Sequence, residues 1–308
     1  MTTVSLPAPA GVRPRRAAGR WARRGPLLPA LLFTIVVTQL PFLATLVISF
    51  TDWNALYPDR RGFAAFGNYT AVLGDPQLRS SILTTVVLTV SVVLVSLVLG
   101  LAIALLLDRR FHGRAIVRTM LIAPFLVVPV AAALLWKHAL YNPEYGLFNG
   151  ILTGVFGQGA AQPDWISDAP MFSVVSSLVW QWTPFMMLIL LAGLQSRSPE
   201  VLEAARVDGA GAFAVFRHIT LPHLRQYLEL GALLGCIYIV QNFDAVFTIT
   251  AGGLGTANLP YTIYQTFYQA HDYGRASAAG VIVVIGSMIV ATFALRVVSS
   301  LLKQEADR

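Results

Sequence analysis

Long apolar stretches alternate with short polar stretches along the chain. Six of the apolar stretches are about 20 residues or longer and carry few charges. They lie at residues 27–50, 82–107, about 115–136, 171–195, about 227–249 and about 276–302. A helix of about 20 mostly apolar residues is long enough to cross the hydrocarbon core of a bilayer. The pattern therefore predicts an all-α integral membrane protein with six transmembrane helices.

The fifth stretch is the least regular. Glu229 lies near its beginning and Asp244 near its end, which leaves residues 230–243 without a charge. If this stretch crosses the membrane, both acids have to lie near a membrane surface or face other helices. Gly231 and Gly235 lie four residues apart in it, a spacing that predicts close packing against a neighbouring helix.

The composition indicates lipid as the solvent for much of the chain. Only 12% of the residues are charged, whereas soluble domains carry roughly 25%. The net charge of +7 does not indicate nucleic acid, because the arginines lie between apolar stretches, as in loops that face an anionic leaflet. The single cysteine, Cys236, excludes an intrachain disulfide and is expected to be a small packing residue.

The basic residues predict the orientation. With the N-terminus in the cytoplasm, 17 of the 22 lysines and arginines fall inside and 5 outside, as the positive-inside rule requires. The prediction is a basic cytoplasmic tail at residues 1–26, a six-span region at 27–302 and a second cytoplasmic tail at 303–308. The first stretch is too long for a cleaved signal peptide and contains Pro29 and Pro41.

Two predicted outer loops, at residues 51–81 and 137–170, are longer than hairpin turns and rich in aromatic residues. These aromatics are either anchors at the membrane surface or a docking surface for an outside partner. They are Trp53, Tyr57, Phe63, Phe66 and Tyr69 in the first loop, and Tyr141, Tyr145, Phe148, Phe156 and Trp165 in the second.

The predicted cytoplasmic loop between the fourth and fifth spans has the features of an ordered structure. Ser198 suits the N-cap of a helix and Pro199 its first position, while Gly209 suits its end. A second short helix is predicted over residues 212–219. Crossing a membrane does not require such a loop, so its length and order predict a docking surface.

This loop resembles the Glu-Ala-Ala signature of ABC importer permeases for carbohydrates. The matching positions and the aspartate before the glycine are Glu203, Ala204, Ala205, Asp208, Gly209, Ile219, Leu221 and Pro222. The resemblance implies that the loop at about residues 197–222 contains a coupling helix, which binds in a groove of a separate ATPase subunit. The alternative is an ordinary amphipathic helix at the surface.

Other segments are similar to the same family. They are residues 66–69, 180–195 and 250–256, although the proline that the family usually has near Leu254 or Gly255 is absent. Residues 258–264, with Asp272, Gly274 and Ala276, resemble the polyol branch. The resemblance implies a permease subunit in the cell inner membrane that imports a sugar or sugar alcohol by alternating access.

The same resemblance implies the partners: two ATPase subunits that use ATP and Mg²⁺, a second homologous permease and an extracytoplasmic solute-binding protein. This chain itself is expected to bind no cofactor. Its two lysines, Lys137 and Lys303, follow Trp136 and Leu302, so it contains no Gly-Lys phosphate-binding loop.

Motifs of catalytic and metal sites are also missing from the sequence, which contains neither a His-Glu-x-x-His nor a Gly-x-Ser-x-Gly motif. The chain is therefore expected to hold no catalytic residue and no metal. The five histidines are expected at the surface: His112, His138, His218, His223 and His271.

Polar residues in the fifth stretch are candidates for the solute path. Gln241 and Asn242 carry amides, which donate and accept hydrogen bonds and so suit hydroxyl-rich solutes, and Asp244 lies nearby. Hydrogen bonding between helices is the alternative role. Two other functions stay open, a stand-alone ion-coupled secondary transporter and a membrane enzyme or scaffold. Prolines in the first, third and fourth stretches are compatible with the broken helices of secondary transporters.

Overall fold

The computed structural model describes residues 28–109, 111–157 and 159–288. The predicted tails at 1–26 and 303–308, and the last part of the sixth predicted span, lie outside these ranges. The chain divides into two units, residues 1–47 and 48–308. The first unit contributes most of α2 (Leu28–Ser49), an apolar helix that contains Pro41.

Three described helices are long and apolar enough to cross a membrane: α2, α4 (Pro76–Asp108) and α9 (Pro170–Gln195). They coincide with the first, second and fourth predicted apolar stretches. α4 begins six residues before its predicted start, because Asp75 caps it by accepting a hydrogen bond from the Gln77 amide. Pro76 occupies the first position, where the missing N–H costs nothing.

The third predicted span, at about 115–136, is bent and consists of more than one helix. α5 (Arg114–Leu126) is followed by α6 (Pro129–Leu134) and the π-helical turn η3 (Leu135–Leu140), and the two limbs meet at 96°. Pro129 disfavours a helical conformation at the preceding residue, and Gln181 donates to the freed Val127 carbonyl at 3.0 Å. Counted as one bent span, this pair brings the candidate spans in the described residues to four.

The fifth predicted span, at about 227–249, is not one continuous helix either. α12 (Leu221–Val240) ends before Gln241, and α13 (Asp244–Ile249) begins three residues later. Within the sixth predicted span, the structure describes a helix over Tyr273–Met288. The shorter elements are η2 (Pro58–Arg60), α3 (Gly67–Gly74), α7 (Leu147–Phe156), α8 (Trp165–Asp168), α14 (Leu259–Tyr264) and η5 (Gln265–Gln269).

A small β-hairpin is the exception to the predicted all-α fold. β1 (Thr51–Asp52) pairs antiparallel with β2 (Gly62–Phe63), with Thr51 opposite Phe63. Strands of two residues are too short to show the alternation of apolar and polar residues by which a strand is predicted. The prediction therefore missed the hairpin, although the rest of the described chain is mainly helical.

The core lies where α4, α9 and α12 pack together. A Cβ on Gly100 of α4 would lie 2.9 Å from the Met186 Cβ, and a Cβ on Gly235 of α12 would lie 2.6 Å from the Met186 Cε. At Gly231 a Cβ would meet the Leu97 side chain at 3.1 Å. The predicted close packing at Gly231 and Gly235 is thus confirmed.

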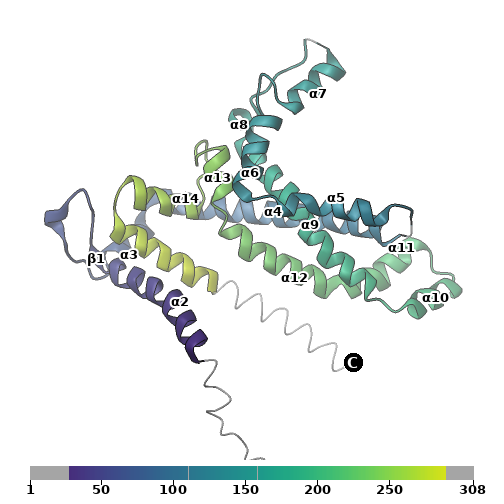
Figure 1. The fold of residues 1–308 in the computed structure, drawn as a ribbon, viewed down its shortest axis with the longest axis horizontal. Coiled ribbons are helices and arrows are strands. Elements are labelled where there is room, and N and C mark those ends of the chain that lie inside the picture. Colours follow the sequence, from purple (N-terminus) through teal and green to yellow (C-terminus); the bar gives the residue numbers. More distant parts are fainter. Residues whose placement is uncertain (1–27, 110, 158, 289–308) are drawn as a thin grey trace, which may run out of the picture. The chain divides into compact units, whose positions relative to one another are not determined.

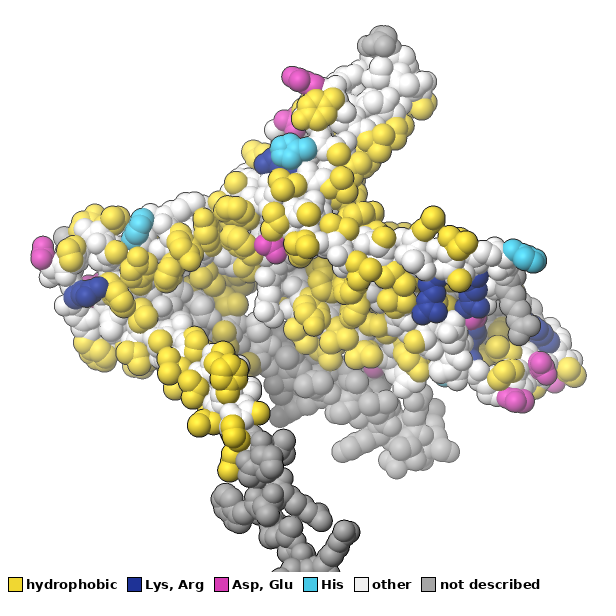
Figure 2. Space-filling model, in the orientation of Figure 1, with side chains coloured by type: hydrophobic (Ala, Val, Ile, Leu, Met, Phe, Trp, Pro, Cys, Tyr) yellow, Lys and Arg dark blue, Asp and Glu magenta, His cyan; other side chains and the backbone are white. Residues whose placement is uncertain are grey.

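The two ends of this helical core differ. Figure 1 shows the short helices α10 (Pro199–Val207) and α11 (Ala212–Val215) at one end of α4, α9 and α12, and α14 toward the other. Figure 2 shows hydrophobic side chains over the middle of the helices and charged side chains near α10 and α11. An apolar middle with a charged end is the surface expected of helices that leave a bilayer.

Candidate coupling loop and polar helix break

The loop after α9 forms two short helices, where the sequence predicts them. α10 ends at Val207, and Gly209, two residues later, has a φ of +79°, in the left-handed region that favours glycine. α11 continues into the π-helical turn η4 (Phe216–Thr220). Ser198 is the N-cap residue, but its hydroxyl oxygen accepts no hydrogen bond from a backbone N–H of the helix. Instead the hydroxyl donates to the Glu200 carboxylate, and this bond lowers the pKa of Glu200.

The tip of this loop exposes apolar side chains next to acids. Val207 is 86% exposed and Phe213 is 75% exposed. Of the residues predicted to couple, most are exposed and two are half-buried. The exposed ones are Glu203, Ala204, Asp208, Gly209, Leu221 and Pro222, and the half-buried ones are Ala205 and Ile219. Exposed apolar groups rimmed by polar ones are typical of a protein–protein contact.

The base of the loop is held by Arg197, a residue that the sequence did not single out. Its Nε donates to the Leu194 carbonyl at 2.9 Å, and its Nη1 donates to the Thr220 hydroxyl at 2.8 Å. Its Nη2 forms an ion pair with the Asp108 carboxylate at 2.7 Å. One side chain therefore joins the ends of α4 and α9 to the start of α12.

A second contact joins the same two helices beside Arg197. The Nε2 of His223 donates to the Gly193 carbonyl at 3.1 Å, and the Tyr227 hydroxyl lies 2.9 Å from the Ser196 hydroxyl. A Cβ on Gly193 would lie 2.6 Å from the Tyr227 ring, so glycine permits this approach. His223, which the sequence predicts at the surface, is half-buried and links α12 to α9.

The three predicted path residues lie at the break between α12 and α13. Gln241 is exposed, whereas Asn242 and Asp244 are half-buried. The Gln241 amide donates to the Ile237 carbonyl at 3.1 Å. The Asn242 Oδ1 is buried, with no hydrogen-bond partner among the described residues. Unwound backbone with polar side chains is tolerated at membrane depth only inside protein or beside a water-filled cavity.

The segment after α13 stabilises this break. Asn258 is fully buried; its amide donates to the Asn242 carbonyl at 2.5 Å, and its oxygen accepts from the Tyr261 N–H at 3.2 Å. Gly252, in the Gly-rich turn, has a φ of +65°, and a Cβ there would overlap the Tyr261 ring. This segment therefore packs against the break through Tyr264 and Phe243 and satisfies the Asn242 carbonyl.

Aromatic rings lie one helical turn before the break. Tyr238 of α12 is 55% exposed, and its ring centroid lies 5.3 Å from that of Trp182 on α9. Trp182 and Phe185 both contact the ring of Phe125 on α5. Aromatic side chains next to a few polar groups are the usual lining of small-molecule sites.

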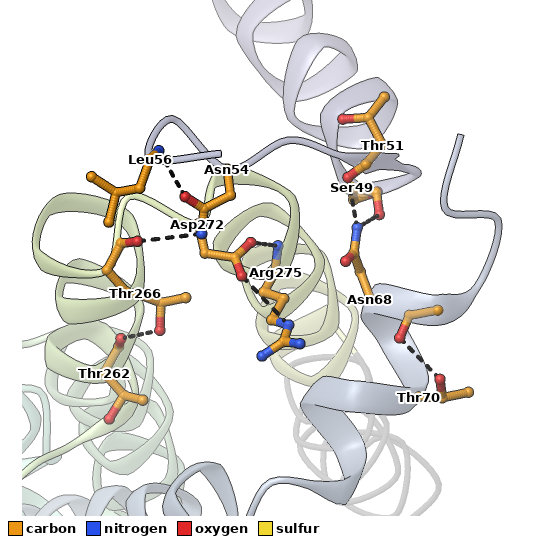
Figure 3. Close-up of polar contacts among 12 residues, drawn as sticks. Ser49, Thr51, Asn54, Leu56, Asn68, Thr70, Thr262, Thr266, Asp272 and Arg275 are labelled. Atoms are coloured by element: carbon orange, nitrogen blue, oxygen red, sulfur yellow. Dashed lines mark hydrogen bonds and ion pairs between the residues drawn. The ribbon is translucent and has the colours of Figure 1, made fainter. Parts of the chain in front are cut away.

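At the opposite end from the coupling loop, the first outer loop is tied to the residues before the last described helix. Figure 3 shows Asn68 donating to the Ser49 and Thr51 carbonyls, at 2.9 and 2.8 Å. It also shows Asp272 accepting from the Arg275 N–H at 3.0 Å. A bridge pairs Asn54 with Asp272. Asn68 and Asp272, both in segments similar to the importer family, thus have structural roles here.

Aromatics of the second outer loop are mostly packed against one another. Tyr141 is fully buried, and Phe148 contacts both Tyr141 and Trp165. The buried Asn149 accepts from the Trp165 Nε1 at 2.8 Å. Tyr141 is therefore a packing residue inside the loop and not a surface aromatic, whereas Phe148 and Trp165 are half-buried. Tyr145 and Phe156 of the same loop are exposed.

A separate cavity of about 560 Å³ lies between α4, α5 and α9 and is lined almost wholly by apolar side chains. Ser176 and Thr183 contribute its two hydroxyls, which is few for a hydroxyl-rich solute. In the part of the chain that the structure describes, no three His, Cys, Asp or Glu side chains lie together as metal ligands would.

Comparison with known proteins agrees with this architecture. Residues 96–304 match the family described as "Binding-protein-dependent transport system inner membrane component". The chain is 34% identical to a probable ABC transporter permease protein of Sinorhizobium fredii, over 84% of each chain. It is also 34% identical to the trehalose/maltose transport system permease protein MalF of Thermococcus litoralis, over 83% of this chain and 86% of that protein.

Solved structures have the same fold. One belongs to a bacterial alginate ABC transporter in complex with an alginate pentasaccharide-bound periplasmic protein, with a TM-score of 0.76 and 21% identity over 89% of this chain and 92% of that chain. A second alginate importer gives a TM-score of 0.78 at 19% identity, over 91% and 96%. The chain belongs to the family of binding-protein-dependent transport system inner membrane components.

Proposed function

We propose that this chain is the membrane-spanning permease subunit of an ATP-driven importer for a sugar or sugar alcohol. The observation that carries the proposal is the ordered loop at α10 and α11, which is fixed to three helices at its base and exposes Val207 and Phe213 at its tip. Relatives named for trehalose and maltose, and structures named for alginate, support a carbohydrate as the solute.

The energy source is a separate pair of ATPase subunits, which bind the ATP and Mg²⁺. In this proposal the chain itself neither binds nor hydrolyses ATP. A second homologous permease and an extracytoplasmic solute-binding protein complete the importer. In this proposal six spans cross the cell inner membrane at residues 27–302, with tails 1–26 and 303–308 in the cytoplasm.

The proposed mechanism is alternating access. ATP closes the two ATPase subunits together, and the coupling helix α10 moves with them. α12 then carries this movement toward the polar break, since its 20 residues extend about 30 Å. The paired permeases open outward to accept the solute from the binding protein and then open inward to release it.

The polar break is the proposed solute path. Amides at Gln241 and Asn242 can donate to and accept from sugar hydroxyls, and the buried Asn242 Oδ1 retains its capacity to accept. Tyr238 supplies an exposed ring next to these groups. Broken helices also occur in ion-coupled secondary transporters, but membership of a binding-protein-dependent family favours the importer.

Co-isolation with the ATPase tests this proposal. Replacing Phe213 by Asp places a charge in the centre of the proposed interface, and we expect at least about a tenfold loss of co-purified ATPase. Phe63→Asp is the matched control, since Phe63 is 81% exposed on the outer hairpin and should leave the ATPase bound. Equal ATPase recovery from both variants and the parent would exclude the loop as the docking site.

The solute class needs a separate measurement. A thermal-shift and uptake screen with sugars and sugar alcohols, performed with the cognate binding protein, is expected to yield ATP-dependent uptake of a hydroxyl-rich solute. Uptake restricted to amino acids or ions would contradict this part of the proposal.

A further inference from the structure

The guanidinium of Arg197 contacts the ends of three helices at once. Asp108 is the last residue of α4, Leu194 lies in the last turn of α9, and Thr220 directly precedes α12. All three contacts are 2.9 Å or shorter. These helices make up the core of the protein, and two of them lead directly into or out of the coupling loop.

The junction is shielded from solvent. The Arg197 side chain is 12% exposed and that of Asp108 is 28% exposed, while Thr220 is 3% exposed. A shielded ion pair is screened less by water and salt than a pair at the surface. Arginine is suited to this place, since its planar fork presents donors in several fixed directions and lysine presents a single point charge.

We propose that Arg197 is a positioning residue for energy coupling. It holds the ends of α4, α9 and α12 as one rigid body with the loop, so that a displacement of α10 and α11 moves the helices instead of bending the loop. This inference rests on the proposed docking of an ATPase to the loop. Arg197 itself need not touch the ATPase or the solute.

The test compares Arg197→Lys with the parent in proteoliposomes that contain the assembled importer and its binding protein. Lysine keeps the charge opposite Asp108 but cannot contact Leu194 and Thr220 in the same way. We expect ATPase recovery and ATP hydrolysis at the parental level, while the number of solute molecules imported per ATP falls about tenfold.

Arg225→Lys is the matched control. Arg225 pairs with Glu229 at 2.9 Å, but both residues belong to α12 and the arginine is 62% exposed. Because this pair lies within one helix, it does not connect α12 to another helix. The number of solute molecules that this variant imports per ATP (the import ratio) should therefore equal that of the parent. A parental ratio in Arg197→Lys would overturn the proposal.

A milder variant covers the case in which Arg197→Lys does not assemble. Thr220→Val removes one acceptor and leaves the ion pair with Asp108 intact. We expect this variant to assemble and its import ratio to fall about threefold; an unchanged ratio would overturn the proposal. If the proposed function were wrong, the parental chain itself would co-purify with no ATPase. If only the role of Arg197 were wrong, the parent would bind the ATPase and the variants would import solute at the parental ratio.

Discussion

At the scale of single residues, close helix packing in this protein depends on a few glycines. Gly193 is the clearest case, since the ring of Tyr227 occupies the position that a Cβ would take. The same tyrosine contacts Ser196, and His223 binds the Gly193 carbonyl. A change at Gly193 therefore affects the contacts that Tyr227 and His223 of α12 make with the end of α9.

Gly193→Ala is expected to lower the free energy of unfolding by about 1–3 kcal/mol, because a Cβ 2.6 Å from a ring must displace it. The midpoint of thermal unfolding in detergent measures this effect. Gly150→Ala in α7 is the control, since a Cβ there has nothing within 4 Å. If the unfolding midpoint of Gly193→Ala were equal to or higher than that of the parent, the packing of α9 against α12 would not require glycine at this position.

At the scale of elements, local signals predicted the coupling loop well. Ser198, Pro199 and Gly209 mark the ends of α10, because caps and glycine turns depend on neighbours in the sequence. The break after Val240 was missed, since apolar residues continue through α13 and the buried Asn258 that stabilises the break follows 16 residues after Asn242.

The Arg197 junction was missed for a related reason. Asp108 is 89 residues away in the sequence, and positions that far apart carry no periodic signal that links them. The aromatic rings of the second outer loop that pack against one another are a similar case. Their composition alone does not distinguish a packed cluster from a membrane anchor.

The helix break has a test of its own. Alanine at Gln241, Asn242 and Asp244 together is expected to abolish most solute uptake, because the groups proposed to bind hydroxyls are removed, while ATPase recovery stays at the parental level. A matched control removes a different pair of amides, the exposed Gln77 and the half-buried Gln265, which lie 3.3 Å apart. Parental uptake by the triple variant at normal expression would exclude these residues from the path.

At the scale of the whole molecule, the orientation in the membrane is a prediction from the basic residues. It places the outer hairpin and the coupling loop on opposite sides of the membrane. The chain has a single cysteine, Cys236, which is half-buried in α12. A Cys236→Ser background therefore permits labelling of one new cysteine at a time.

Two exposed positions report the two sides. In intact cells, a membrane-impermeant maleimide should label Phe63→Cys and leave Val207→Cys unlabelled. In inverted membrane vesicles the pattern should reverse. Labelling of Val207→Cys from outside the cell would show that the predicted orientation is wrong, and with it the cytoplasmic position of both termini.

The most direct test of the central claim is reconstituted transport. Proteoliposomes that contain this permease, its partner permease and the ATPase are supplied with binding protein and a radiolabelled disaccharide. We expect uptake that requires ATP and stops when the ATPase is omitted, whether or not an ion gradient is present. Uptake driven by an ion gradient in liposomes that contain this chain alone would contradict it.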